Sequence, residues 1–201
     1  MLPCMRIEYS NSQGLSNSND LSKDSPRGQR LLGQEDISLK LRRLATQIAE
    51  MHSSGDVYFV GIHTRGVTVA KRVSALLTEM GINVEIGTID ISFYRDDLDH
   101  RITNPIVQSS EIPFEIEGHN IIIFDDVLYT GRTIRSAIQG VFKYGRPSKV
   151  ELAVLIDRGN RELPIQPDYV GQVVETKRLD SIRVCFEEHD GEDSISLISA
   201  S

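Results

Sequence analysis

The stretch that decides the fold is residues 121–133, Ile-Ile-Ile-Phe-Asp-Asp-Val-Leu-Tyr-Thr-Gly-Arg-Thr. The apolar run, rich in Ile and Phe, predicts a strand buried on both faces, as in a parallel sheet. Asp125 and Asp126 follow it and are expected at the carboxyl end of the strand, where such sheets bind ligands. The Thr-Gly pair at 130–131 lets backbone N–H groups approach an anion, and a helix beginning near Arg132 directs its positive end there. The stretch therefore predicts acceptors for sugar hydroxyls or a metal beside a nest for a phosphate, as a ribose 5-phosphate requires.

Other interpretations of this stretch are weaker. An Asp-Asp pair alone is usually a solvated loop, and a Thr-Gly pair a turn. An acidic magnesium site of a nucleotide triphosphatase would also require Gly-x-x-x-x-Gly-Lys-Ser/Thr, which the chain lacks. The chain has no Gly-x-Gly-x-x-Gly either, so a dinucleotide-binding fold of the usual kind is not expected. The position of the acids between a buried strand and a helix start favours the sugar-phosphate site.

Length and composition indicate a single soluble domain. The chain has 201 residues, a formal net charge of −7 and two cysteines, Cys4 and Cys185. The negative charge argues against generic nucleic-acid binding, although a local basic face is compatible with it. The distant cysteines lack metal or redox spacing, and no apolar run has the length of a membrane span or a signal-peptide core. We therefore expect a cytoplasmic protein.

The chain divides into a tail and a domain. Residues 1–33 are rich in Ser, Asn, Asp and Gly, so we expect a flexible tail followed by a domain over residues 34–201. The domain opens with an amphipathic helix that Asp36 is expected to cap. Further strands are expected at residues 84–91, 150–156 and 182–186, with an edge strand at 195–198.

A second strand, loop and helix unit begins at residue 57. Its apolar strand, residues 57–62, ends at His63-Thr64-Arg65-Gly66, and a helical repeat follows. A polar, glycine-containing loop at a helix start suits an anion, and Arg65 supplies charge-assisted hydrogen bonds to a phosphate. The sequence thus predicts a second anion site.

These strings resemble those of the type I phosphoribosyltransferases, which use 5-phosphoribosyl 1-pyrophosphate (PRPP). Asp-Asp-Val-Leu-Tyr-Thr-Gly-Arg-Thr at 125–133 resembles their PRPP signature and is most similar to that of one branch, the PyrR family of pyrimidine operon regulators. Three more strings are similar to PyrR: Gly-Ile-His-Thr-Arg-Gly at 61–66, Tyr-Arg-Asp-Asp-Leu at 94–98 and Asp-Arg-Gly-x-Arg-Glu-Leu-Pro at 157–164. The resemblance covers about residues 31–190. It implies an α/β fold with a central, mostly parallel sheet flanked by helices, a small hood region and a flexible lid loop.

The resemblance also implies the site. In the family, the two acids bond the ribose 2- and 3-hydroxyls, the following turn holds the 5-phosphate, and the loop at 63–66 holds the pyrophosphate. Catalytic roles are thereby implied for Asp125, Asp126 and Arg65. The implied substrate-binding residues are Thr64, Arg65, Gly66, Arg101, Asp125, Asp126, Val127, Leu128, Tyr129, Thr130, Gly131, Arg132, Thr133, Arg158 and Ile182.

Three of these residues lie outside the two anion loops. Arg101 falls in the long charged connection after residue 92, which is expected to act as a lid, with a surface patch of ion pairs as the alternative. Arg158 is expected on the base or phosphate side, and Ile182 stands where the family reads uracil with backbone groups. His63 stands where Lys or another residue is more usual, and we assign it no catalytic role.

The implied reaction converts uracil and PRPP to UMP and pyrophosphate, with Mg²⁺ carried on the pyrophosphate and no direct metal ligand from the protein. PyrR proteins also bind a stem-loop of pyr messenger RNA when UMP is bound and so attenuate transcription. The residues assigned to RNA are Arg42, Arg43 and Arg161. The family forms dimers and larger assemblies, so a homodimer or a higher homo-oligomer without a membrane partner is expected.

Two alternatives to this function stay open. Thr46, Gln166 and Gln172 stand where family members often carry His, Arg or Lys. Each lost cation weakens phosphate contacts, so one alternative is a phosphoribosyltransferase with weak or no RNA binding. The other alternative is an enzyme for a different nucleobase, such as a purine, because base recognition rests largely on backbone groups.

Overall fold

The computed structural model describes residues 28–52, 56–91 and 110–200. The helices in these ranges are α1 (Gln34–Met51), α2 (Arg65–Glu79), α3 (Arg132–Val141) and α4 (Glu187–Asp190). The strands are β1 (Gln29–Leu32), β2 (Val57–Ile62), β3 (Val84–Ile89), β4 (Asn120–Leu128), β5 (Lys149–Asp157), β6 (Tyr169–Val173), β7 (Ser181–Cys185) and β8 (Ser194–Ile198). Residues 1–27 of the expected tail, and residues 92–109 of the connection that is expected to form the lid, lie outside the described ranges.

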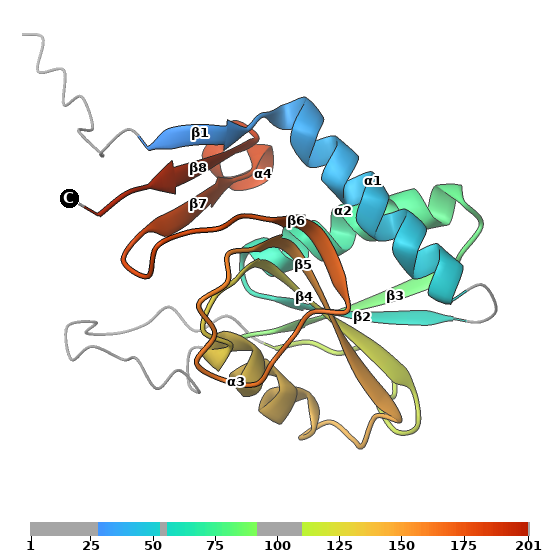
Figure 1. The fold of residues 1–201 in the computed structure, drawn as a ribbon. Helices are drawn as coiled ribbons and strands as arrows, with labels where there is room; N and C mark the ends of the chain where they lie inside the picture. The colour runs from blue at the N-terminus through green and yellow to red at the C-terminus, as the bar shows by residue number, and fades with distance from the viewer. Residues whose placement is uncertain (1–27, 53–55, 92–109, 201) are drawn as a thin grey trace, which may run out of the picture.

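The main sheet is parallel throughout and has the strand order β3-β2-β4-β5-β6 (Figure 1). From β2 the chain passes through α2 to β3 on one side, whereas from β4 it passes through α3 to β5 on the other. The two connections therefore diverge between β2 and β4, which makes this the topological switch point of the sheet. Ligands of open α/β sheets bind at such points.

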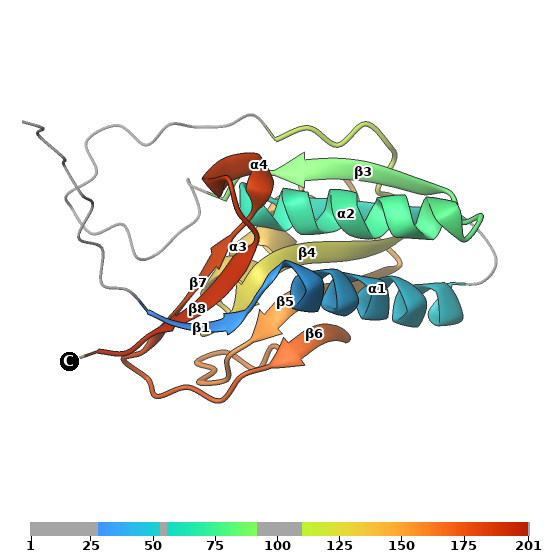
Figure 2. The same ribbon diagram turned by 90° about the horizontal axis from the view of Figure 1, so that it is seen from above.

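The central strand β4 contributes to two cores. Ile122 and Phe124 pack in one core with α1 and α2, which lie side by side over one face of the sheet (Figure 2). Ile121 and Ile123 pack in the other core with α3. All four side chains are fully buried, and each such burial contributes about 1.5–3 kcal/mol. Burial on both faces explains why this strand is continuously apolar rather than alternating.

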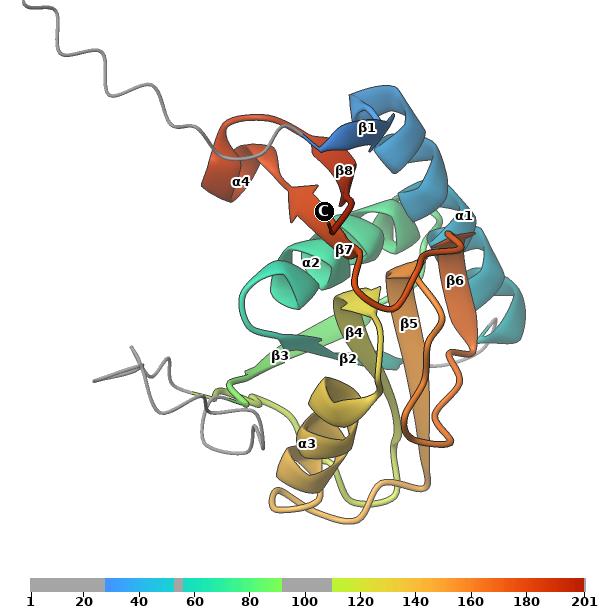
Figure 3. The same ribbon diagram turned by 60° about the vertical axis from the view of Figure 1, so that its left-hand side comes forward.

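A small antiparallel sheet of order β1-β8-β7 forms the hood. It stands beside the carboxyl end of the main sheet, where β7 contacts β4 (Figure 3). The α/β class, the mostly parallel central sheet with flanking helices, and the hood are thus confirmed.

Two expectations about the ends of the domain were wrong. β1 begins at Gln29 and pairs with β8, so the folded domain starts before residue 34. The strand at 194–198 is the middle strand of the hood sheet rather than an edge strand. In both cases the pairing joins segments from opposite ends of the chain, and local composition carries no information about it.

Candidate active site at the carboxyl edge of the main sheet

Two adjoining cavities open at the switch point. The first has a volume of about 310 Å³ and is lined by residues 127–134 of the turn after β4, with Asp125 and Glu162. The second has a volume of about 250 Å³ and is lined by residues 62–65, Asp90, Ile91, residues 125–127 and Thr133. Asp125, Val127 and Thr133 border both cavities. A ligand with two anionic ends can therefore occupy both at once.

The turn that lines the first cavity is fixed by its backbone conformation and by backbone hydrogen bonds. Gly131 has a φ of 91° and is the N-cap of α3, a conformation that favours glycine. The carbonyl of Thr130 accepts hydrogen bonds from the N–H groups of Glu162 (3.0 Å) and Leu163 (3.1 Å), which tie the turn to the loop after β5. The first N–H groups of a helix have no intrahelical acceptor. The start of α3 thus offers an anion a fixed set of backbone donors.

The two acids at the end of β4 are linked to each other. Asp125 is 7% exposed, and its Oδ1 accepts the N–H of Asp126 at 3.0 Å. Oδ1 of Asp126 accepts the N–H of Val127, also at 3.0 Å. Burial raises the pKa of Asp126 above its ordinary value, although its hydrogen bond with Asp125 and the charge of Arg65 act in the opposite direction. The carboxyl of Asp126 therefore retains a proton more readily than an exposed carboxyl does.

The loop after β2 packs closely against β4. A Cβ added at Gly66 would overlap the carbonyl oxygen of Phe124, so glycine lets the first turn of α2 pack directly on the strand that carries the acids. The peptide bond between His63 and Thr64 is cis. Nη2 of Arg65 donates to both carboxylate oxygens of Asp190, at 2.9 and 3.0 Å. Nε of Arg65 is buried without a hydrogen-bond partner.

Arg132 lines the first cavity, and its side chain is paired with an acid. Its Nε donates to Glu162 at 2.9 Å, and Arg178 donates to the same carboxylate at 3.1 Å. The hydrogen bond from Arg132 is the main cause that lowers the pKa of Glu162. The side chain of Arg132 is therefore already paired with an acid at the rim of the cavity.

Arg158 and Arg161 anchor the loop after β5. Arg158 is 5% exposed, lies 3.9 Å from the centroid of the Tyr129 ring, and donates to Thr176 Oγ1 and the Lys177 carbonyl, both at 3.1 Å. Arg161 donates to Asp157 at 2.6 Å and to the Tyr129 carbonyl at 3.0 Å. Both guanidinium groups thus bond within the protein. Substrate contact by Arg158 and RNA contact by Arg161 remain predictions that would require these bonds to rearrange.

The remaining predicted residues are spread over the molecule. Thr64 lines the second cavity. Ile182 is half-buried in β7 of the hood. Arg42 and Arg43 are exposed on α1, far along the chain from Arg161, and Arg101 lies outside the described residues.

Sequence reasoning missed two acids. Asp90 follows β3, is 7% exposed and lines the second cavity. An acid directly after an apolar strand was the signal that identified Asp125, and it was available here too. Asp190 is different, because its pairing with Arg65 joins residues 125 positions apart and leaves no local signal.

Fold and site together define a phosphoribosyltransferase. A model of the phosphoribosyl transferase domain family matches residues 29–189. Among solved structures, a hypoxanthine phosphoribosyltransferase of Trypanosoma cruzi has a TM-score of 0.67 at 17% identity, covering 86% of this chain and 97% of that one. A hypoxanthine-guanine phosphoribosyltransferase of Bacillus anthracis has a TM-score of 0.64 at 17% identity, covering 86% and 99%. At this identity these two likenesses establish the fold alone.

Curated relatives with higher sequence identity show to which family of phosphoribosyltransferases the chain belongs. A bifunctional protein PyrR of Elusimicrobium minutum is 45% identical over 166 residues, which cover 82% of this chain and 93% of that protein. A bifunctional protein PyrR of Roseiflexus sp. is 46% identical over 163 residues, covering 80% and 89%. The chain therefore belongs to the PyrR family. In the ranges that the structure describes, no helix has both the length and the apolarity to cross a membrane.

Proposed function

We propose that this protein transfers the 5-phosphoribosyl group of PRPP to uracil and releases UMP and pyrophosphate. The observation that carries the proposal is the pair of cavities that share Asp125. One offers backbone donors at the start of α3, and the other contains Arg65. A ribose held by the acids between the two cavities would place its 5-phosphate in the first cavity and its pyrophosphate in the second. Membership of the PyrR family supports the same reaction.

The proposed chemistry is substitution at the anomeric carbon. The bond from this carbon to the pyrophosphate oxygen breaks and its electron pair leaves with pyrophosphate. A bond to a uracil nitrogen forms, and that nitrogen releases its proton to solvent. The sugar becomes cationic on the way, so the protein must chiefly hold the base and leaving group in line. Arg65 would hold the pyrophosphate, and Asp125 would stabilise the developing cation electrostatically. Asp126 would fix the ribose through its hydroxyls.

The residues present fit a magnesium ion that arrives with the substrate. Asp90, Asp125 and Asp126 line the second cavity, and Mg²⁺ prefers carboxylate, phosphate and water oxygens. Within the described ranges, no group of three or more His, Cys, Asp or Glu side chains is arranged to hold a metal. The ion would therefore share its coordination with the pyrophosphate. When bound there, it neutralises charge on the leaving group.

A second role, UMP-dependent binding of pyr messenger RNA, belongs to the same proposal. The curated relatives are named bifunctional, and α1 exposes Arg42 and Arg43 as cationic groups. A titration with pyr leader RNA, with and without UMP, tests this role. Tight, UMP-dependent and salt-sensitive retention supports it. RNA binding that does not depend on UMP would instead support a phosphoribosyltransferase without RNA regulation. Homo-oligomerisation and a cytoplasmic location remain predictions.

Steady-state turnover of uracil, PRPP and Mg²⁺ tests the reaction. Asp125→Asn and Arg65→Ala should each lower turnover by at least about ten-fold, because each removes a contact to the reacting sugar or its leaving group. Asp56→Asn and Arg146→Ala make the same changes at exposed residues outside both cavities and should leave turnover unchanged. Unchanged turnover in both site variants would rule out the mechanism. A panel of nucleobases in the same assay separates uracil from a purine as the acceptor.

A further inference from the structure

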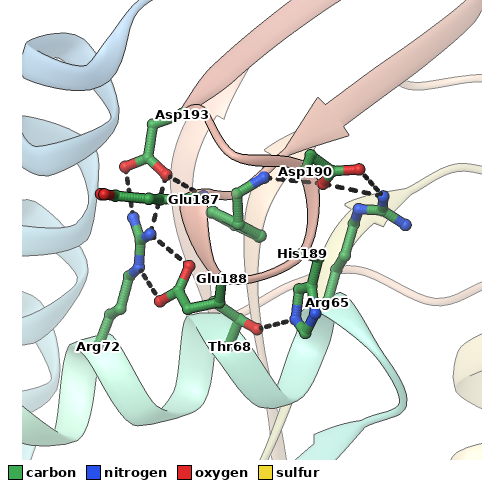
Figure 4. Close-up of polar contacts among 9 residues, drawn as sticks. Arg65, Thr68, Arg72, Glu187, Glu188, His189, Asp190 and Asp193 are labelled. Atoms are coloured by element: carbon green, nitrogen blue, oxygen red, sulfur yellow. Dashed lines mark hydrogen bonds and ion pairs between the residues drawn. The ribbon is translucent and has the colours of Figure 1, made fainter.

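One side of α2 is bonded to the C-terminal segment 186–193, which comprises α4 and its flanks (Figure 4). Arg65, Thr68 and Arg72 are spaced three and four residues apart and so share one face of the helix. Arg65 donates to Asp190, and Thr68 Oγ1 lies 2.8 Å from Nε2 of His189. Figure 4 shows the three side chains of α2 reaching the segment at separate points.

Arg72 fixes the segment independently of Arg65. Its Nη1 and Nη2 donate to the two oxygens of Asp193, at 2.6 and 2.8 Å. Asp193 has a side chain only 5% exposed, and it also accepts the N–H of Glu187 at 2.9 Å. Arg72 donates to both oxygens of Glu188, at 2.9 and 2.6 Å, and stacks 4.8 Å from the centroid of the Phe186 ring. A bidentate pair of this kind sets orientation as well as distance.

The carboxylate of Asp190 is likewise set by the segment. Its Oδ2 accepts the N–H of Phe186 at 3.0 Å, which holds the side chain in place without any contribution from Arg65. Both oxygens then accept from a single nitrogen of Arg65, Nη2. The neighbouring donor, Nε, is buried without a partner, and Arg65 lines the second cavity beside Asp125 and Asp126. The Arg65 side chain is 37% exposed, so a ligand in that cavity can reach its guanidinium group.

We infer that Asp190 is a positioning residue for the pyrophosphate, acting through Arg65; this inference rests on the proposed function. A flexible arginine must be ordered when it binds an anion, and an arginine already oriented avoids that cost. The carboxylate of Asp190 holds one end of the guanidinium and leaves its remaining donors for the leaving group. The C-terminal segment thereby belongs to the PRPP site without touching the sugar. The 5-phosphate turn after β4 does not depend on it.

Calorimetric titrations with PRPP and Mg²⁺, and separately with UMP, test the inference. Asp190→Ala should raise the Kd for PRPP about ten-fold, because Arg65 loses its orientation. The Kd for UMP should stay within about two-fold, because UMP has no pyrophosphate. Asp190→Glu keeps the carboxylate and should recover part of the affinity. Glu187→Gln removes a neighbouring exposed charge with no side-chain bond to Arg65 and should behave like the original protein.

A double-mutant cycle completes the test. If Asp190 acts through Arg65, then Asp190→Ala should have little further effect on PRPP binding in an Arg65→Ala background. Asp190→Asn keeps an oxygen for the Phe186 N–H, so the comparison remains available if Asp190→Ala does not fold. An unchanged or lower Kd for PRPP, a parallel loss of UMP binding, or additive effects in the cycle would each overturn the inference. A protein that binds PRPP but forms no UMP would overturn the proposed reaction alone. A protein that takes up no PRPP would overturn both.

Discussion

The two anion loops of the site are built in different ways. The turn after β4 is held by nearby backbone: a left-handed glycine, the start of α3, and hydrogen bonds from the loop after β5. The loop after β2 has a backbone hydrogen bond from His63 to Ile89, but its Arg65 is oriented by the side chain of Asp190 from the far end of the chain. Backbone donors carry no charge that titrates, whereas the second arrangement depends on carboxylates. The two ends of a bound PRPP should therefore respond differently to mutation and to acid.

The largest effect is expected where the two loops meet, at Gly66. In Gly66→Ala, the new methyl group would overlap the backbone of β4, so helix α2 must shift, at a cost of about 3 kcal/mol in unfolding free energy. PRPP binding should be lost. Gly140→Ala is a matched helical control, because its methyl group meets only the end of the Ile89 side chain, which can move. Its cost should stay below about 1 kcal/mol. Equal costs in urea titrations would contradict the close approach of α2 to β4.

The next largest effect is expected on the stability of the protein at low pH. The hydrogen bond from Arg72 is the main cause that lowers the pKa of Asp193. A carboxyl with a lowered pKa adds stability above its unfolded value, near 3.9, and this stability is lost as the pH falls through the folded value. Asp193→Asn should therefore cost about 2 kcal/mol at pH 7 and flatten the decline of unfolding free energy below pH 4. An unchanged acid slope in urea titrations would exclude this ion pair as a source of stability.

A smaller effect is expected at the turn after β4. In Gly131→Ala, an alanine must adopt a φ of 91° and contact Leu163 and Ile165, which should cost about 1–2 kcal/mol and weaken UMP binding about ten-fold. Gly118→Ala imposes similar strain at a φ of 76°, with open space around the methyl group and no contact with either cavity. It should lose stability without losing UMP affinity. UMP binding that is equally weak in both variants would show that the turn itself is unimportant.

The smallest effect is expected at Glu162. Its carboxylate bonds to Arg132 and Arg178 at the rim of the first cavity, and exposed ion pairs contribute little to stability. Glu162→Gln should leave the unfolding free energy almost unchanged. It should strengthen UMP binding up to about three-fold, because a negative charge near the phosphate is removed. Weaker UMP binding in calorimetry would indicate that the acid orients Arg132 for the phosphate.

The contrast between the loops also explains what the sequence could predict. The turn after β4 was predictable because its strand, acids, glycine and helix start are consecutive, and its backbone geometry follows from them. The parallel sheet was predictable because β4 is apolar without alternation, as a strand buried on both faces must be. The pairing of β1 with β8 and of Arg65 with Asp190 was not predictable, since neither short segment constrains its distant partner. The hydrogen bonds of Arg161 to Asp157 and to the Tyr129 carbonyl were not predictable for the same reason. A cation in a loop is expected to be exposed to solvent unless its acceptors within the protein are known.

The most direct measurement is a crystal structure of the protein with UMP bound. The phosphate is expected within about 3 Å of the backbone N–H groups at 130–133, with the ribose hydroxyls on Asp125 and Asp126. The side chain of Arg65 should then remain on Asp190, because UMP has no pyrophosphate. A phosphate found at Arg65, or anywhere away from the start of α3, would contradict the assignment of the two cavities.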